Sequence, residues 1–170
     1  RSTRIRPHRD DKVLASWNGL MISALAYGAQ VLDDPQYAAA AGRAAEFVLT
    51  KMRRPDGRIL RRYRAGEAAV PGFLDDYAFM ALGLLDLYEA TFDPRWLKEA
   101  RGLARETVRL FRDDAGAAFY DAAADAEKLV ARPRDLDDGA VPSGNSVAAL
   151  VLLRLGRLTA EVELEAQGRR

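Results

Sequence analysis

Three pairs of adjacent carboxylates recur along the chain roughly every sixty residues: Asp10-Asp11, Asp75-Asp76 and Asp137-Asp138. Two carboxyl groups that face one ligand can carry acid–base chemistry, because one donates a proton while the other accepts one or activates water. Crowded carboxylates also raise one another's pKa, which suits a general acid. The pairs therefore supply the candidate catalytic residues Asp11, Asp75 and Asp76, and Asp138 as a candidate substrate contact.

Helix capping is the alternative explanation for these pairs. Aspartate is a preferred N-cap residue, and a carboxylate is favoured at the positive end of a helix. A cap needs only one carboxylate, so one member of a pair can cap while its neighbour points into a cavity. His8 lies beside the first pair and is the only histidine in the chain. It is a fourth catalytic candidate, since it titrates near pH 7, and the alternative is a surface side chain in a leading loop.

Aromatic and amide side chains near the carboxylates are candidate substrate contacts. Trp17 and Tyr77 offer ring faces on which a sugar can stack, although an aromatic residue at helical spacing is more often part of a core. Asn18 lies in an apolar run and Asn145 begins another. A buried amide must find hydrogen-bonding partners, and these would be ligand hydroxyls or a neighbouring loop.

Two kinds of helix alternate along the sequence. Residues 11–32, 74–90 and 145–155 are predicted helices that are rich in apolar residues, the second of them nearly all round. Residues 35–52 and 94–111 are predicted amphipathic helices, each with Pro at its first position after an Asp cap, Asp34 or Asp93. Asp10 or Asp11 is the expected cap of the first helix. Short β segments are expected near residues 59–70 and 119–130, and an outer helix is expected after Thr159.

This alternation is typical of the inner and outer helices of an α/α toroid built from tandem helical hairpins. The predicted fold class is all-α, a partial toroid with short β excursions. The chain holds about two and a half hairpins against about six in a closed ring, so residues 1–170 are expected to form a single domain that is a fragment of a larger barrel. Inner helices run in one direction, which would bring the carboxylate pairs to one mouth. The uncovered apolar end predicts contact with further hairpins or a second copy of the chain.

Composition excludes several functional classes. The 26 basic and 25 acidic residues are mixed along the chain without a basic block, so no nucleic-acid partner is expected. With no cysteine, a single histidine and no Gly-rich phosphate loop, neither a metal nor a cofactor is expected. No apolar run is long enough to span a membrane. The lack of cysteine fits a reducing compartment, and we expect a cytoplasmic location.

Three segments together resemble a known family: residues 6–22, 72–78 and 142–146, the last reading Pro-Ser-Gly-Asn-Ser. They are similar to the thioredoxin-domain-containing proteins related to spermatogenesis-associated protein 20, and the resemblance extends from about residue 4 to 159. It implies an N-terminal thioredoxin-like domain, absent from this chain, followed by a six-hairpin barrel. That barrel is similar to those of N-acylglucosamine 2-epimerases and six-hairpin glycosidases, and this chain matches its middle.

Two functions follow as hypotheses, and whether the protein is an enzyme stays open. The first is a barrel that binds or acts on a small-molecule sugar in the intact parent protein, the isolated fragment being inactive. The second is a non-catalytic helical scaffold that accompanies a thioredoxin-like redox domain. Epimerases of the resembling fold use histidines on inner helices, which this chain lacks, and this counts against epimerase chemistry.

Overall fold

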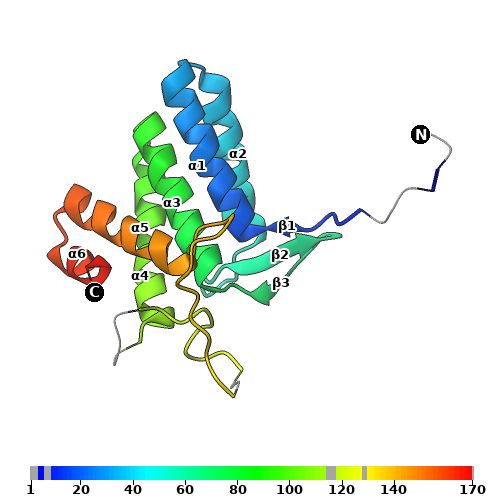
Figure 1. Ribbon diagram of the computed structural model, residues 1–170. Coiled ribbons are helices and arrows are strands. Elements are labelled where there is room, and N and C mark those ends of the chain that lie inside the picture. The colour runs from blue at the N-terminus through cyan, green and yellow to red at the C-terminus, as the bar shows by residue number, and fades with distance from the viewer. Residues whose placement is uncertain (1–3, 6–8, 114–117, 128–129, 170) are drawn as a thin grey trace.

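The computed structural model describes residues 4–5, 9–113, 118–127 and 130–169 (Figure 1). Over these ranges the chain is mostly helical with one small sheet, which confirms the predicted fold class. The helices are α1 (Ala15–Leu32), α2 (Pro35–Lys51), α3 (Leu74–Thr91), α4 (Pro94–Phe111), α5 (Gly144–Thr159) and α6 (Val162–Gly168).

The helices form three successive hairpins, α1–α2, α3–α4 and α5–α6. Helices α1, α3 and α5 pack side by side as the inner layer, with α3 between the other two (Figure 1). Because α3 contacts helices on several sides, most of its residues are buried, as its apolar composition predicts. The short α6 supplies the expected outer helix after Thr159.

The caps of the outer helices confirm the prediction from sequence. The Asp34 carboxylate accepts a hydrogen bond from the Gln36 backbone N–H at 2.9 Å, and Asp93 caps α4 in the same way through Arg95. The predicted cap of α1 by Asp10 or Asp11 is wrong. Residues 13–14 form a strand instead, so α1 begins only at Ala15 and both carboxylates lie too far upstream to cap it.

A three-stranded antiparallel sheet flanks the start of α1, in the order β1 (Val13–Leu14), β2 (Leu60–Arg64) and β3 (Glu67–Pro71). Strands β2 and β3 turn through Ala65-Gly66, whose φ angles of 51° and 86° match a two-residue hairpin turn. This sheet confirms the β segment expected near residues 59–70. The second expected segment is wrong: the described part of residues 119–130 contains no strand, and Phe119 makes only an isolated bridge with Arg112.

Helices α1 and α3 approach closely through two glycines. A Cβ atom on Gly19 would lie 2.4 Å from the Phe79 carbonyl carbon, and one on Gly83 would lie 2.5 Å from the Gly19 carbonyl oxygen. Any side chain at either position would therefore separate the helices.

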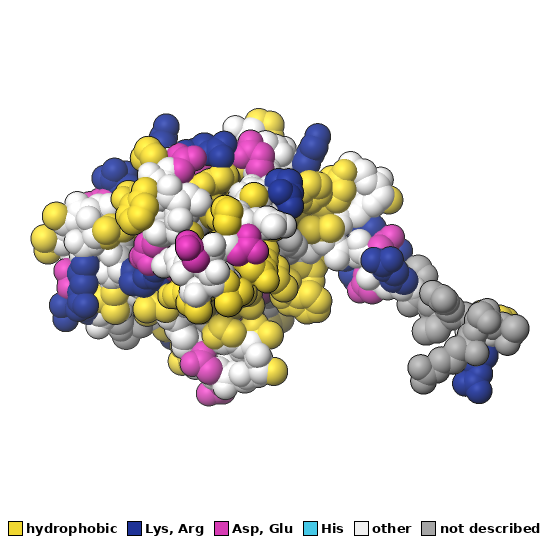
Figure 2. Space-filling view, turned by 90° about the horizontal axis from the view of Figure 1, so that it is seen from above, with side chains coloured by type: hydrophobic (Ala, Val, Ile, Leu, Met, Phe, Trp, Pro, Cys, Tyr) yellow, Lys and Arg dark blue, Asp and Glu magenta, His cyan; other side chains and the backbone are white. Residues whose placement is uncertain are grey.

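Apolar side chains remain exposed on the inner helices. Viewed from above, hydrophobic side chains reach the surface between scattered charged ones over a wide part of the molecule (Figure 2). On α1 they include Met21 and Val31, and on α5 Leu150. The prediction that further hairpins or a second copy cover such a face stays a prediction. None of the helices described is long and apolar enough to cross a membrane.

Candidate functional site

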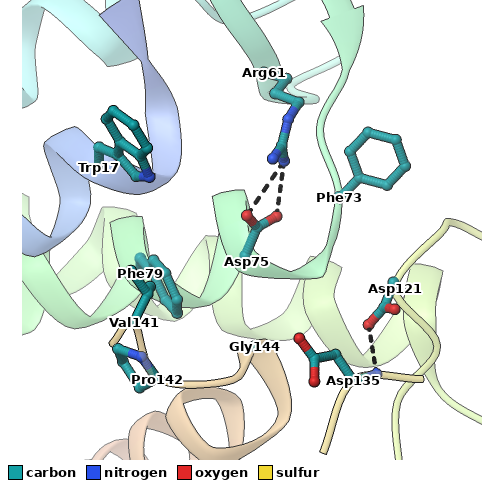
Figure 3. Close-up of a pocket in the computed structure, with 10 residues that line it drawn as sticks. All are labelled: Trp17, Arg61, Phe73, Asp75, Phe79, Asp121, Asp135, Val141, Pro142 and Gly144. Atoms are coloured by element: carbon teal, nitrogen blue, oxygen red, sulfur yellow. Dashed lines mark hydrogen bonds and ion pairs between the residues drawn. The ribbon is translucent and has the colours of Figure 1, made fainter. Parts of the chain in front are cut away.

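An open pocket of about 390 Å³ lies where the N-terminal ends of α1, α3 and α5 meet the sheet and the segment that precedes α5 (Figure 3). Its walls combine aromatic rings, one guanidinium and three carboxylates. The lining residues are Trp17, Arg61, Phe73, Asp75, Phe79, Asp121, Asp135, Val141, Pro142 and Gly144. The three inner helix starts thus converge at one mouth, as the toroid topology predicts.

An ion pair crosses the pocket from β2 to α3. The Arg61 Nη1 atom lies 2.9 Å and 3.2 Å from the two carboxylate oxygens of Asp75 (Figure 3), and both side chains are about one-third exposed. Burial works against the charge on Arg61, but the nearby Asp76 and Asp75 carboxylates outweigh it and raise the guanidinium pKa. Phe73 lies against the same guanidinium, with its ring centre 5.0 Å from Cζ. The pocket therefore has a fixed charged wall that remains in contact with solvent.

Asp76 lies beneath this wall and is fully buried. Its carboxylate accepts hydrogen bonds from the backbone N–H groups of Ser16 and Phe73, both at 3.0 Å, and from Arg61 at 2.9 Å. It therefore caps α3, and it also accepts a hydrogen bond from a backbone N–H group in the first turn of α1. Burial, reinforced by the neighbouring charge of Asp75, raises the pKa of Asp76 to about 6. The sequence predicted Asp76 as a catalytic candidate that contacts the ligand, whereas the structure places it behind the pocket wall.

This pKa shift predicts how stability changes with pH. A carboxyl group whose pKa rises from its ordinary 3.8 to about 6 on folding binds its proton more tightly in the folded state. Its contribution to stability is therefore full below pH 3.8 and is lost as the pH rises to about 6. We expect the unfolding free energy of the wild type, minus that of Asp76→Asn, to fall by about 2 kcal/mol between pH 4 and pH 7. Urea titrations at both pH values measure it, and a difference that grew with pH would contradict the raised pKa.

Asp121 and Asp135 are the pocket carboxylates that sequence reasoning missed. Asp121 accepts a hydrogen bond at 3.1 Å from the backbone N–H of Asp135 (Figure 3), and burial raises the pKa of Asp121. Neither side chain forms an ion pair in the described part of the chain. They lie in a segment without regular secondary structure, so no periodicity marked them. The sequence feature that pointed to this segment was the Asp137-Asp138 pair, which begins two residues after Asp135.

Asp138 of the third carboxylate pair and Asn145 stabilise this segment. The Asp138 carboxylate accepts a hydrogen bond from the Ser143 backbone N–H at 2.8 Å, just before α5. The amide of Asn145 is bonded on both sides to the backbone of Phe119, at 2.7 Å and 3.1 Å, and donates to the Asp135 carbonyl at 2.9 Å. Neither Asp138 nor Asn145 lines the pocket. Both hold the backbone that carries Asp135 and the residues before Gly144.

The first pair lies on the surface beside the sheet. Asp10 pairs with Lys12 at 3.2 Å and Asp11 with Arg64 at 2.6 Å, and neither lines the pocket of Figure 3. Both carboxylates are more than half exposed. His8 lies outside the described residues. Of the three catalytic candidates that the structure describes, Asp75 lines the pocket, and Asp11 and Asp76 do not.

The aromatic and amide candidates also differ in whether they line the pocket. Trp17 is 64% exposed and forms one wall of the pocket (Figure 3). Tyr77 is buried in the core, where its hydroxyl accepts a hydrogen bond at 3.1 Å from the Ile59 N–H. The Asn18 amide donates to the Leu14 carbonyl one turn earlier at 2.8 Å. Trp17 is therefore the aromatic ligand contact that the geometry supports.

The pocket carboxylates do not form a metal site. Among the residues that the structure describes, no three His, Cys, Asp or Glu side chains are grouped closely enough to hold an ion. Ligand binding here would instead use hydrogen bonds from the carboxylates and Arg61, together with stacking on Trp17.

Comparisons with known proteins place this geometry in a family context. No family model matches the chain. Rat spermatogenesis-associated protein 20 is 41% identical over 169 aligned residues, covering 94% of this chain and 21% of the relative, and the human protein is 40% identical over 94% and 22%. The chain is related to spermatogenesis-associated protein 20. It spans about a fifth of the length of these relatives, and the resemblance to this family inferred from the sequence is confirmed.

Solved structures show which fold this chain adopts. Cellobiose 2-epimerase from Bacillus thermoamylovorans superposes with a TM-score of 0.75 at 14% identity, over 96% of this chain and 44% of that enzyme. The GH76 alpha-mannanase BT2949 from Bacteroides thetaiotaomicron gives a TM-score of 0.71 at 18% identity, over 95% and 44%. At these identities the likeness establishes the α/α-barrel fold alone.

Proposed function

We propose that the pocket between Trp17 and Asp135 binds a carbohydrate in the full-length protein. The observation that carries the proposal is an indole left 64% exposed on α1, at a pocket that also presents one guanidinium and three carboxylates. An exposed tryptophan offers its ring face to a ligand, and sugar rings present apolar C–H faces that stack on indole. The fold supports the proposal, since barrels of this kind occur in cellobiose 2-epimerase and alpha-mannanase.

The polar groups are suited to ligand hydroxyls. Arg61 is a donor and Asp75 an acceptor, and their mutual ion pair fixes both side chains at the pocket wall. Asp121 and Asp135 add acceptors on the side of the pocket away from Trp17 (Figure 3). If the full-length protein also catalyses a reaction, Asp121 is a proton-transfer candidate, because it lines the pocket and burial raises its pKa above the ordinary value.

Replacement of Trp17 by alanine tests the proposal. We expect Trp17→Ala to weaken sugar binding by the full-length protein at least tenfold, because a stacked aromatic contributes about 1.5 kcal/mol. Ligand-observed NMR with glucose, mannose, N-acetylglucosamine and their disaccharides measures it. Tyr27→Ala is the matched control, an aromatic residue 51% exposed on the same helix but outside the pocket. Equal binding by wild type and Trp17→Ala would refute the proposal.

A helical scaffold is the second candidate function. It is favoured by the carboxylates and amide that serve only internal hydrogen bonds, namely Asp76, Asp138 and Asn145. The exposed apolar residues of α1 fit the same role, since they would pack against another part of the parent protein or its thioredoxin-like domain. Absence of sugar binding throughout the panel would favour the scaffold.

A further inference from the structure

A second cavity adjoins the pocket and shares two of its lining residues. It encloses about 470 Å³ beside β1 and β2, and both Trp17 and Arg61 line it as well as the first pocket. Its remaining walls come from residues in and beside the sheet: Asp10 and Lys12, which pair with each other, and Leu14, Arg62 and Val70. Each cavity alone has a volume near the lower end of the ~300–1,000 Å³ range typical of ligand sites. The shared residues make them two parts of one surface.

The second cavity contains a cation that the fold does not use. Arg62 lies on β2 and is partly shielded from solvent, yet its guanidinium has no hydrogen-bonding or ionic partner in the portion of the chain described. Arg61, the preceding residue, is by contrast held by two carboxylates. A partly buried guanidinium retains its hydrogen-bonding demand, and its N–H donors can bind the hydroxyl oxygens of a sugar.

We propose that the two cavities are adjacent subsites for a carbohydrate of at least two sugar units, with Trp17 and Arg61 at their junction. The proposal rests on the proposed function, since it extends the same site. One unit occupies the pocket lined by Asp75, Asp121 and Asp135. The next unit lies in the second cavity, where Arg62 donates to it.

Comparing the affinities of a monosaccharide and its disaccharide tests the two-subsite proposal. For a sugar that binds the full-length protein, we expect the disaccharide to bind at least about tenfold more tightly than its monosaccharide. Arg62→Gln should bring that ratio close to one by weakening the disaccharide while leaving the monosaccharide affinity unchanged. Arg43→Gln on α2, which lines neither cavity, is the control and should change nothing. Titration calorimetry measures the affinities, and thermal unfolding verifies that each variant is folded.

The binding results distinguish a failure of the two-subsite proposal from a failure of the proposed function. If the monosaccharide and the disaccharide bind with equal affinity, and Trp17→Ala weakens both, the two-subsite proposal is overturned. The proposal that the pocket binds sugar would still stand. An undiminished length preference in Arg62→Gln would likewise overturn the assignment of the second subsite. If neither monosaccharide nor disaccharide binds, the proposed function fails and the subsites fail with it.

Discussion

Replacing Gly19 with alanine is expected to cost about 3 kcal/mol of unfolding free energy, the upper end for overpacking in a core. The new Cβ would lie 2.4–2.6 Å from backbone atoms of Phe79 and Met80. Backbone in the middle of a buried helix cannot move aside as a flexible side chain can, so α1 and α3 must separate. This interface joins two hairpins and supports one side of the pocket, so the cost spreads beyond a single contact.

Urea unfolding of Gly19→Ala beside Gly102→Ala measures this effect. Gly102 lies inside α4, and a Cβ there would meet no atom within 4 Å outside its own helix and immediate neighbours. The better helix propensity of alanine should therefore raise stability by about 0.8 kcal/mol in that control. Opposite signs for the two substitutions are the expected result. A stability loss at Gly19 no larger than 0.5 kcal/mol, on the scale of ordinary surface changes, would show that α1 and α3 are not so closely packed.

The hairpins could be predicted from the sequence because their signals are local. Asp34-Pro35 and Asp93-Pro94 mark helix starts through the fixed φ of proline and the acceptor of aspartate. The apolar composition of α3 predicted its burial. The start of α1 could not be predicted in this way, because the strand at Val13–Leu14 depends on pairing with β2 about fifty residues later.

The site was harder to predict than the fold, because its residues come from segments distant in sequence. Trp17 and Asp75 were identified from their positions near the inner helix starts. Arg61 lies in the β segment expected near residues 59–70, and only the fold shows that it faces α3. Asp121 and Asp135 lie on irregular backbone held by Asn145. Residue type and spacing cannot place such a segment, because long-range hydrogen bonds determine its course.

Removal of the Asp76 carboxylate is the second change with a large expected effect. Asp76→Ala would leave the N–H groups of Ser16 and Phe73 without acceptors and deprive Arg61 of one partner. A buried polar group that loses its partner costs about 1–3 kcal/mol, and several are affected at once. We therefore expect a loss of about 3 kcal/mol in the unfolding free energy at pH 7. Chemical denaturation of the purified variant measures it.

Asp75→Ala separates a structural from a catalytic role for this pair. Asp75 is 31% exposed and Asp76 remains to pair with Arg61, so the expected loss is only about 1 kcal/mol. Sugar binding should depend more directly on Asp75 than on Asp76, because Asp75 lines the pocket and Asp76 does not. If Asp76→Ala kept wild-type stability yet abolished the function of the full-length protein, Asp76 would have to act on the ligand itself. The hydrogen bonds that it makes to α1, β2 and its own helix argue instead that it holds the three walls in position.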